Sequence, residues 1–240
     1  MWNTIAQRLK GQKLRNELRV FLLILIYLTL SCRGGGVIQV SEFPEQKRSL
    51  PGTITLVNWN AQKFLNPQFT DDLQTLIERQ KPDIVFLQES HADLLQMRQI
   101  GGYFAEGWSY PWPDGTTIGV LTLSKVAPDR VEPVPSKYRE FSLAAPKLSL
   151  ITEHSLPNGE TLLAVNVHLM NFERWRLLKL RSQLDELKTI IEKHRGPVLM
   201  AGDFNTWSEK RLGLVEGLAE ELKLKEVTDF PPGRTTADMH

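Results

Sequence analysis

The sequence has one cysteine, Cys32, among its 240 residues, and it lacks several well-known catalytic motifs. A single cysteine excludes disulfides within the chain, cysteine-rich zinc sites and CxxC redox centres. There is no GxxxxGK[ST] phosphate loop, no GxSxG nucleophile turn and no HExxH zinc helix. These absences argue against P-loop nucleotide hydrolases, serine hydrolases with a nucleophile elbow and zinc proteases.

The sequence also lacks an excess of either charge. It has 29 Lys and Arg against 28 Asp and Glu, a net charge of +1, with 41% hydrophobic and 24% charged residues. These values are ordinary for a soluble globular protein, which excludes a disordered chain and a polytopic membrane protein. The length is that of one domain, with two small domains as an alternative.

Charge and hydropathy single out the first 32 residues. Five basic residues stand against Glu17 alone, and an apolar run follows over residues 20–30. Eleven apolar residues are short for a membrane span, which needs about 20, but they suit a signal peptide. Ser31-Cys32 after this run resembles a bacterial lipobox, although Thr29 stands where leucine is usual. We predict a lipoprotein signal over 1–32 with lipidation of Cys32. An uncleaved anchor, another signal or a buried core helix are the alternatives.

The interpretation of residues 1–32 sets the predicted location. Residues 33–52 are rich in glycine, proline and charge, and we expect them to be a linker between the membrane and a domain over 53–240. The domain then lies in the bacterial cell envelope, associated with the membrane and outside the cytoplasm. From Cys32 onward the chain has 24 basic and 27 acidic residues, a net of −3, and thus no general attraction to nucleic acid.

From Thr53 onward, strand patterns alternate with helix patterns. Leucine and isoleucine recur at 177, 180, 184, 187 and 191, the spacing of an amphipathic helix over 173–194. We expect residues 101–115 to be a loop that contains Trp108 and Trp112. The pattern predicts an α/β or α+β sandwich of sheets covered by helices. The other expected strands cover 54–57, 83–87, 117–123, 148–153, 162–167 and 197–201, and the other expected helices start at Asp71 and cover 93–97 and 208–223.

Four predicted strands end in polar clusters, at residues 58–60, 88–90, 166–168 and 203–205. Ligand sites on α/β scaffolds form where strands end, so neighbouring strands would bring these side chains together. The candidate site then consists of Asn60, Glu89, His168, Asp203 and Asn205.

This set of side chains favours hydrolysis of a phosphoester by water. The Glu89 and Asp203 carboxylates are hard ligands for Mg²⁺ or Mn²⁺, and His168 can move a proton near neutral pH. The amides of Asn60 and Asn205 suit phosphate oxygens, and the set contains no covalent nucleophile. Taken singly, each residue has a structural alternative, such as a helix cap or a half-buried histidine. Trp59 and Phe204 are expected in the core, and the remaining histidines at 91, 154 and 194 on the surface.

The order of these clusters resembles a known family. Asn58-Trp59-Asn60, Gln88-Glu89, residues 166–169 (NVHL) and residues 202–205 (GDFN) are similar to the motifs of the endonuclease/exonuclease/phosphatase superfamily, which includes deoxyribonuclease-I-like nucleases. Residues 196–208, with Asn171-Phe172, are similar to a bacterial YafD-like branch. The resemblance covers about 53–240. It implies a four-layer α/β-sandwich with two packed mixed β-sheets.

The resemblance also implies a role for each site residue. Glu89 would hold Mg²⁺ or Mn²⁺ with Asn60 close to metal and phosphate. His168 would contact the phosphate or assist the leaving group, Asp203 would orient or activate water, and Asn205 would bind phosphate oxygens. The implied substrate is a phosphoester from nucleic acid, phospholipid or a small molecule. The protein is expected to act as a monomer.

The family pattern normally continues with LDHxF and Ser-Asp-His motifs, which residues 233–240 do not match. We therefore expect a domain that is C-terminally incomplete and lacks its last strands. Two functions follow. The first is a metal-dependent phosphoesterase of the cell envelope, and the alternative is a catalytically impaired, membrane-tethered phosphate-binding or remnant protein.

Overall fold

The computed structural model describes residues 34–39, 49–62, 67–90, 102–111, 117–140, 146–173 and 176–227. The predicted signal over 1–32, Cys32 and the expected helix over 93–97 lie outside these residues and stay predictions. Within the described ranges, no helix has the length and apolar character needed to cross a bilayer.

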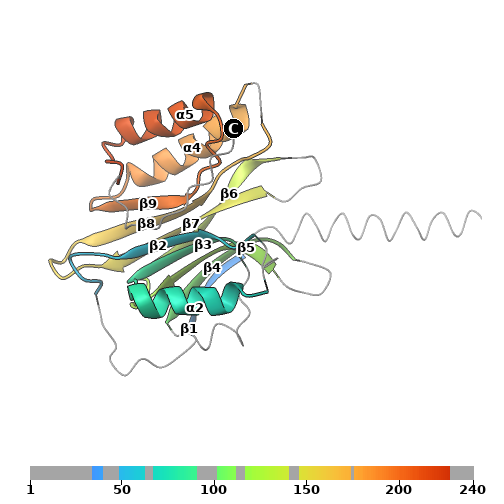
Figure 1. The fold of residues 1–240 in the computed structure, drawn as a ribbon. Coiled ribbons are helices and arrows are strands. Elements are labelled where there is room, and N and C mark those ends of the chain that lie inside the picture. The colour runs from blue at the N-terminus through green and yellow to red at the C-terminus, as the bar shows by residue number, and fades with distance from the viewer. Residues whose placement is uncertain are drawn as a thin grey trace, which may run out of the picture.

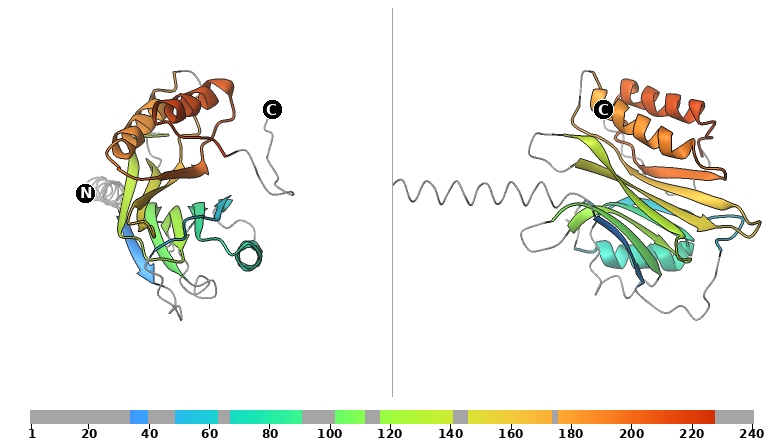
Figure 2. Two further views of the ribbon diagram at one scale, coloured as in Figure 1. Left: turned by 90° about the vertical axis from the view of Figure 1, so that its left-hand side faces the viewer. Right: turned by 180° about the vertical axis from the view of Figure 1, so that it is seen from behind.

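Two mixed β-sheets pack face to face and carry helices on their outer faces (Figures 1 and 2). The first sheet has the order β1 (Gly34–Gln39), β4 (Tyr103–Pro111), β5 (Thr117–Ser124), β3 (Ile84–Ser90) and β2 (Leu56–Asn60). The second has the order β6 (Arg130–Arg139), β7 (Pro146–Ser155), β8 (Thr161–His168) and β9 (Val198–Asp203). In each sheet one pair is parallel, β2 with β3 and β8 with β9, and the other pairs are antiparallel. The predicted four-layer sandwich of two mixed sheets is confirmed.

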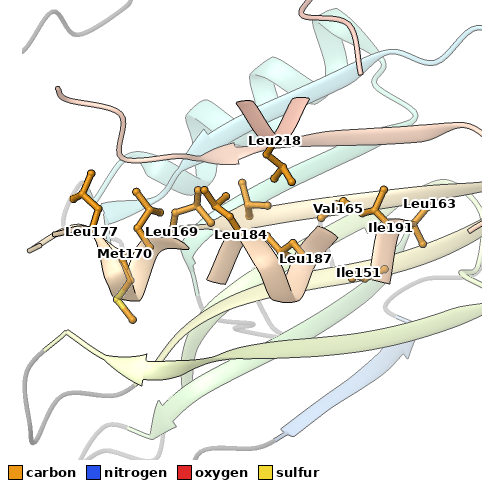
Figure 3. Packing of buried hydrophobic residues seen from close by; sticks show 12 residues of the cluster. Ile151, Leu163, Val165, Leu169, Met170, Leu177, Leu184, Leu187, Ile191 and Leu218 are labelled. Atoms are coloured by element: carbon orange, nitrogen blue, oxygen red, sulfur yellow. The ribbon is translucent and has the colours of Figure 1, made fainter. Parts of the chain in front are cut away.

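The predicted leucine spacing builds the outer layer on the second sheet. Helices α4 (Leu178–Ile191) and α5 (Glu209–Glu221) cover the outer face of the second sheet (Figures 1 and 2). Figure 3 shows Leu184, Leu187 and Ile191 of α4 in one apolar cluster with Leu163 and Val165 of β8. Each such fully buried side chain contributes about 2 kcal/mol through removal of apolar surface from water.

Apolar clusters also lie on the outer face of the first sheet and between the two sheets. Helix α2 (Phe69–Gln80) covers the outer face of the first sheet, where Phe69 and Leu73 pack against Leu87 and Leu121. Trp59 is partly buried and packs against this layer, with its ring centroid 4.7 Å from that of Phe69, so it lies at the margin of the core in which it was expected. Between the sheets, small clusters join residues of β3 to β8 and residues of β4 and β5 to β7.

Part of the expected linker is folded, and in this respect the prediction of a linker over 33–52 is wrong. Residues Gly34–Gln39 form β1, which pairs antiparallel with β4. Leu50 is fully buried, and its N–H donates to the carbonyl of Ser155 at 2.9 Å. Strand pairing uses backbone groups, so a glycine-rich segment without an apolar period can still add an edge strand.

Two further strands were not expected. β4 occupies most of the predicted loop over 101–115, where Gly107 interrupts the strand pattern but lets β4 approach Leu148 of the other sheet. β6 contains Pro133 and Pro135 and lies at the edge of its sheet. Proline cannot donate a ladder hydrogen bond and is tolerated at an edge, which explains why the pattern concealed this strand.

Helix boundaries and one histidine also differ from the predictions. α2 begins at Phe69, before the expected cap at Asp71. α4 begins at Leu178, after the expected start at 173, because the Glu173 carboxylate accepts the backbone N–H groups of Lys179 and Leu180 at 2.9 and 3.1 Å. His154, which was expected on the surface, is fully buried on β7.

Candidate active site

The ends of β2, β3, β8 and β9 bring the predicted polar residues together. Nε2 of His168 lies 3.6 Å from Oε1 of Glu89 and 3.8 Å from Oδ2 of Asp203. Nδ2 of Asn60 donates to the same Oδ2 of Asp203 at 2.8 Å. Because β2 and β3 belong to one sheet and β8 and β9 to the other, the site lies across the seam between the two sheets.

Asn205 completes the set through Asp203. Its backbone N–H donates to Oδ1 of Asp203 at 3.0 Å, and its side-chain amide donates to the carbonyl of Leu169 at 2.9 Å. Asn205 has a φ of 51°, in the left-handed region, which asparagine tolerates better than most residues. Both carboxylate oxygens of Asp203 therefore accept hydrogen bonds, which fix the orientation of this side chain.

Gly202 places Asp203 against β8. It has a φ of 148°, and a Cβ atom at this position would lie 2.0 Å from the carbonyl oxygen of Val167. Backbone atoms cannot yield to such a contact, so the Gly-Asp order is a steric requirement of the site.

Glu89 lies on a β-bulge. The register between β3 and β5 shifts between Gln88 and Ser90, and Glu89 has a φ of 48°. A bulge turns a side chain out of its alternating position, here toward His168. Left-handed conformations of residues other than glycine cost about 1 kcal/mol or more and cluster at functional sites.

A buried amide network supports the site from behind. Nε2 of Gln88 donates to Oδ1 of Asn58 at 2.9 Å and to Oδ1 of Asn166 at 2.6 Å. Nδ2 of Asn166 donates in turn to the carbonyl of Leu121 at 3.0 Å, and thus connects the second sheet with the first. Gln88 and Asn166 are fully buried, and each precedes a site residue by one or two positions. The network therefore fixes Glu89 and His168 relative to each other.

Lys147 belongs to the site although no motif in the sequence points to it. Its Nζ lies 2.8 Å from Nε2 of His168 and 3.9 Å from Oε1 of Glu140. A charged ammonium group only donates, so Nε2 of His168 is then the acceptor and carries no proton. Lys147 lies at the start of β7, beside the end of β8, because these two strands are antiparallel. This hairpin register was the available signal for including it.

The donors present fit a hard divalent cation. The side chains of Glu89 and Asp203 are 23% and 27% exposed, so water reaches both carboxylates. Oδ1 of Asn60 accepts the N–H of Gln62 at 2.9 Å and retains a second lone pair. Within the described ranges, no group of three or more His, Cys, Asp and Glu side chains is arranged to hold a metal ion. Mg²⁺ usually keeps several waters and takes only one or two carboxylates, so this donor set suits it.

The sequence from β2 of the first sheet into α5 matches a known family. Residues 57–215 match the Endonuclease/Exonuclease/phosphatase family over most of the described fold. The chain belongs to this family. It is also 30% identical, over 185 residues, to a UPF0294 protein of Vibrio parahaemolyticus, a match that covers 77% of this chain and 64% of that protein. The chain therefore spans somewhat less than two thirds of the length of this relative.

Solved structures of the same family share the fold. An endonuclease/exonuclease/phosphatase family protein from Leptotrichia buccalis superposes with a TM-score of 0.56 at 14% identity, covering 70% of this chain and 74% of that chain. TDP2 of D. rerio, solved with a single-stranded DNA product, superposes with a TM-score of 0.54 at 21% identity, covering 69% and 65%. The members of this family include nucleases and phosphatases, which are enzymes that hydrolyse phosphoester bonds. The chain shares their fold.

Proposed function

We propose that this protein is a metal-dependent phosphoesterase of the bacterial cell envelope, in which an activated water attacks the phosphorus. One observation carries the proposal. Asn60, Glu89, His168 and Asp203 come from four different strands of two sheets, and their side-chain atoms meet at distances of 2.8 to 3.8 Å. Structural roles such as helix capping do not require this convergence.

Glu89 and Asn60 are the residues proposed to hold Mg²⁺ or Mn²⁺. A bound divalent cation would offset the negative charge that develops on the phosphoryl oxygens during attack. The bulge then serves the proposed chemistry, because it places the partly exposed carboxylate of Glu89 3.6 Å from Nε2 of His168.

The remaining residues bind the phosphate and handle the proton. Oδ2 of Asp203, fixed by Asn60, is the proposed acceptor for the proton of the attacking water. Asn205 uses one amide N–H for the Leu169 carbonyl, and the second can donate to a phosphate oxygen. The Lys147 ammonium supplies positive charge beside His168, and both side chains are proposed to contact the phosphate.

The proposed setting follows from residues 1–32. A cleaved lipoprotein signal with lipidation at Cys32, or an uncleaved anchor, would hold a monomeric domain at the membrane outside the cytoplasm. The substrate is a phosphoester of nucleic acid, of a phospholipid or of a small molecule. Replacing Cys32 with serine should abolish incorporation of radiolabelled fatty acid, and labelling that survives the change would contradict lipidation there.

Hydrolysis of bis-p-nitrophenyl phosphate tests the activity itself. We expect release of p-nitrophenol by the 240-residue chain with Mg²⁺ and its loss on chelation with EDTA. Inorganic phosphate that binds without turnover would support the alternative function, a catalytically impaired phosphate-binding protein. The chain spans less than two thirds of its curated relative, so the same assay on that longer protein is the natural comparison.

A further inference from the structure

Two large aromatic side chains are exposed on the loops that follow the catalytic strands. Phe172 follows β8 and is 64% exposed, and Trp207 follows β9 and is 38% exposed. Trp207 is four residues after Asp203, so its Cα lies within about 14 Å of that of Asp203 even with the backbone fully extended. This is a distance that one or two nucleotides can bridge.

Two polar contacts fix the indole ring of Trp207. Its Nε1–H donates to Oδ1 of Asn171 at 2.8 Å. The guanidinium carbon of Arg211 lies 5.1 Å from the ring centroid, within the range of a cation–π contact. A surface tryptophan held by its nitrogen and by the face of its ring has little rotational freedom left to lose when a ligand binds.

Arg211 also ties the indole to the site. It is fully buried on α5 and donates to the carbonyls of Asn205, at 2.5 Å, and of Glu173, at 3.0 Å. A third donation goes to the carbonyl of Met170. These carbonyls belong to the two loops that carry Phe172 and Trp207. Arg211 therefore fixes the backbone of both loops relative to Asn205.

We propose that Trp207 is a stacking platform for a nucleobase attached to the phosphate that the site binds, with Phe172 as the exposed aromatic residue of the adjacent loop. The proposal rests on the proposed function, because it assumes that phosphate binds at Asn205, Lys147 and His168. It deepens that function by naming the substrate class as a nucleotide phosphoester. Aromatic stacking is tolerant of base identity, so the platform would select for a planar base and not for one sequence.

The surroundings of Trp207 favour a base over a membrane surface. The Glu140 carboxylate accepts the N–H of Asn171 at 2.5 Å, and Glu173 lies beside it on the same loop. The Glu140 carboxylate thus fixes the backbone of Asn171, whose side chain accepts the indole N–H. A fixed ring plane suits stacking, whereas insertion into a bilayer needs no defined ring orientation.

Calorimetric titration of the 240-residue chain with Mg²⁺ tests the proposal through binding, without reliance on turnover. The two ligands are thymidine 5′-monophosphate and 2-deoxyribose 5-phosphate, which differ only in the base. We expect the wild type to bind the nucleotide about 5- to 150-fold more tightly, the range of one stacking contact. Trp207→Ala should remove this preference and change the Kd of the sugar phosphate by less than about twofold, while Trp207→Phe should retain most of it.

The control is Leu212→Ala, which truncates another exposed apolar residue of the same region and should leave the preference unchanged. An equal preference for the nucleotide in wild type and Trp207→Ala would overturn the proposal. If the sugar phosphate binds the wild type as tightly as the nucleotide does, the stacking platform is also excluded, but the proposed phosphate site is not. Sedimentation with anionic vesicles that Trp207→Ala abolishes, with the preference unchanged, would assign Trp207 to a membrane. If neither ligand binds the wild type, the phosphate site and the platform both fail.

Discussion

The side-chain amide of Asn60 donates a hydrogen bond of 2.8 Å to Oδ2 of Asp203, although 143 positions separate them in the sequence. Asn60 ends β2 in the first sheet, and Asp203 ends β9 in the second. Beside this bond, Nδ2 of Asn58 donates to the carbonyl of Gly202 at 3.4 Å. The orientation of the proposed base thus depends on the packing of one sheet on the other.

Replacing Asn60 with alanine should lower kcat for bis-p-nitrophenyl phosphate by roughly 10- to 100-fold, because the carboxylate loses the donor that orients it. The melting temperature should change by only a few degrees, since the amide is partly exposed. Asn158→Ala, in the exposed turn between β7 and β8, is the matched control and should keep full activity. An Asn60→Ala enzyme with unchanged kcat would show that this bond has no part in the reaction.

Thermal unfolding with and without Mg²⁺ tests the metal site independently of activity. A ligand at 100 times its Kd stabilises the folded state by about 2.7 kcal/mol, which corresponds to a rise of roughly 5 to 10 °C for a domain of this size. Glu89→Gln keeps the shape of the side chain but removes the charge, so we expect it to abolish most of this rise. The same rise in wild type and Glu89→Gln would place any bound metal elsewhere.

Asn166→Ala should destabilise the fold by about 3 kcal/mol, because it removes buried hydrogen bonds and opens a cavity. Nε2 of Gln88 loses one of its two acceptors and keeps Asn58, and the carbonyl of Leu121 loses the amide donor. Equilibrium unfolding in urea measures the change, with Thr189→Ala on the exposed face of α4 as the control. A loss no larger than that of the control would show that the amide network adds nothing to stability.

His154 should make stability depend on pH between about 6.5 and about 4. Burial lowers the pKa of His154 from 6.5 to about 4, and the charge of Asp129 offsets part of this effect. The unfolded chain binds a proton on this ring below about 6.5, whereas the folded chain does so only near 4. Stability is therefore fully present above 6.5 and falls as the pH drops toward 4, by up to about 3 kcal/mol.

Urea unfolding of wild type and His154→Gln across this pH range isolates the contribution of the histidine. The glutamine can keep a hydrogen bond to the Thr152 hydroxyl, which lies 3.0 Å from Nε2 of His154. The difference in unfolding free energy between the two proteins should shrink or reverse as the pH falls. Parallel curves for the two proteins over the whole range would exclude the effect.

Periodicity and strand ends predicted much of the fold and of the site. The leucine spacing around Leu184 located α4 because an amphipathic helix must bury one face. The polar clusters around Glu89 and Asp203 located the site because they interrupt buried strands at their ends. In these places a local pattern has a direct physical cause in burial.

Other features depend on partners that are distant in the sequence. β6 pairs through its backbone at a sheet edge, where prolines mask the usual strand pattern. Lys147 enters the site only through the antiparallel register of β7 with β8, which no local pattern around residue 147 reveals. Burial of His154 likewise follows from packing between elements and not from its neighbours in the chain.

The most direct test of the proposed hydrolase is the rate of p-nitrophenol release from bis-p-nitrophenyl phosphate by Asp203→Asn. Asp185→Asn, on the exposed face of α4, is the matched control for the loss of one carboxylate charge. We predict that Asp203→Asn lowers kcat at least about 100-fold with Mg²⁺ present, because it removes the proposed proton acceptor, while Asp185→Asn stays within about twofold of wild type. Equal turnover by wild type and Asp203→Asn would contradict the assignment of this site.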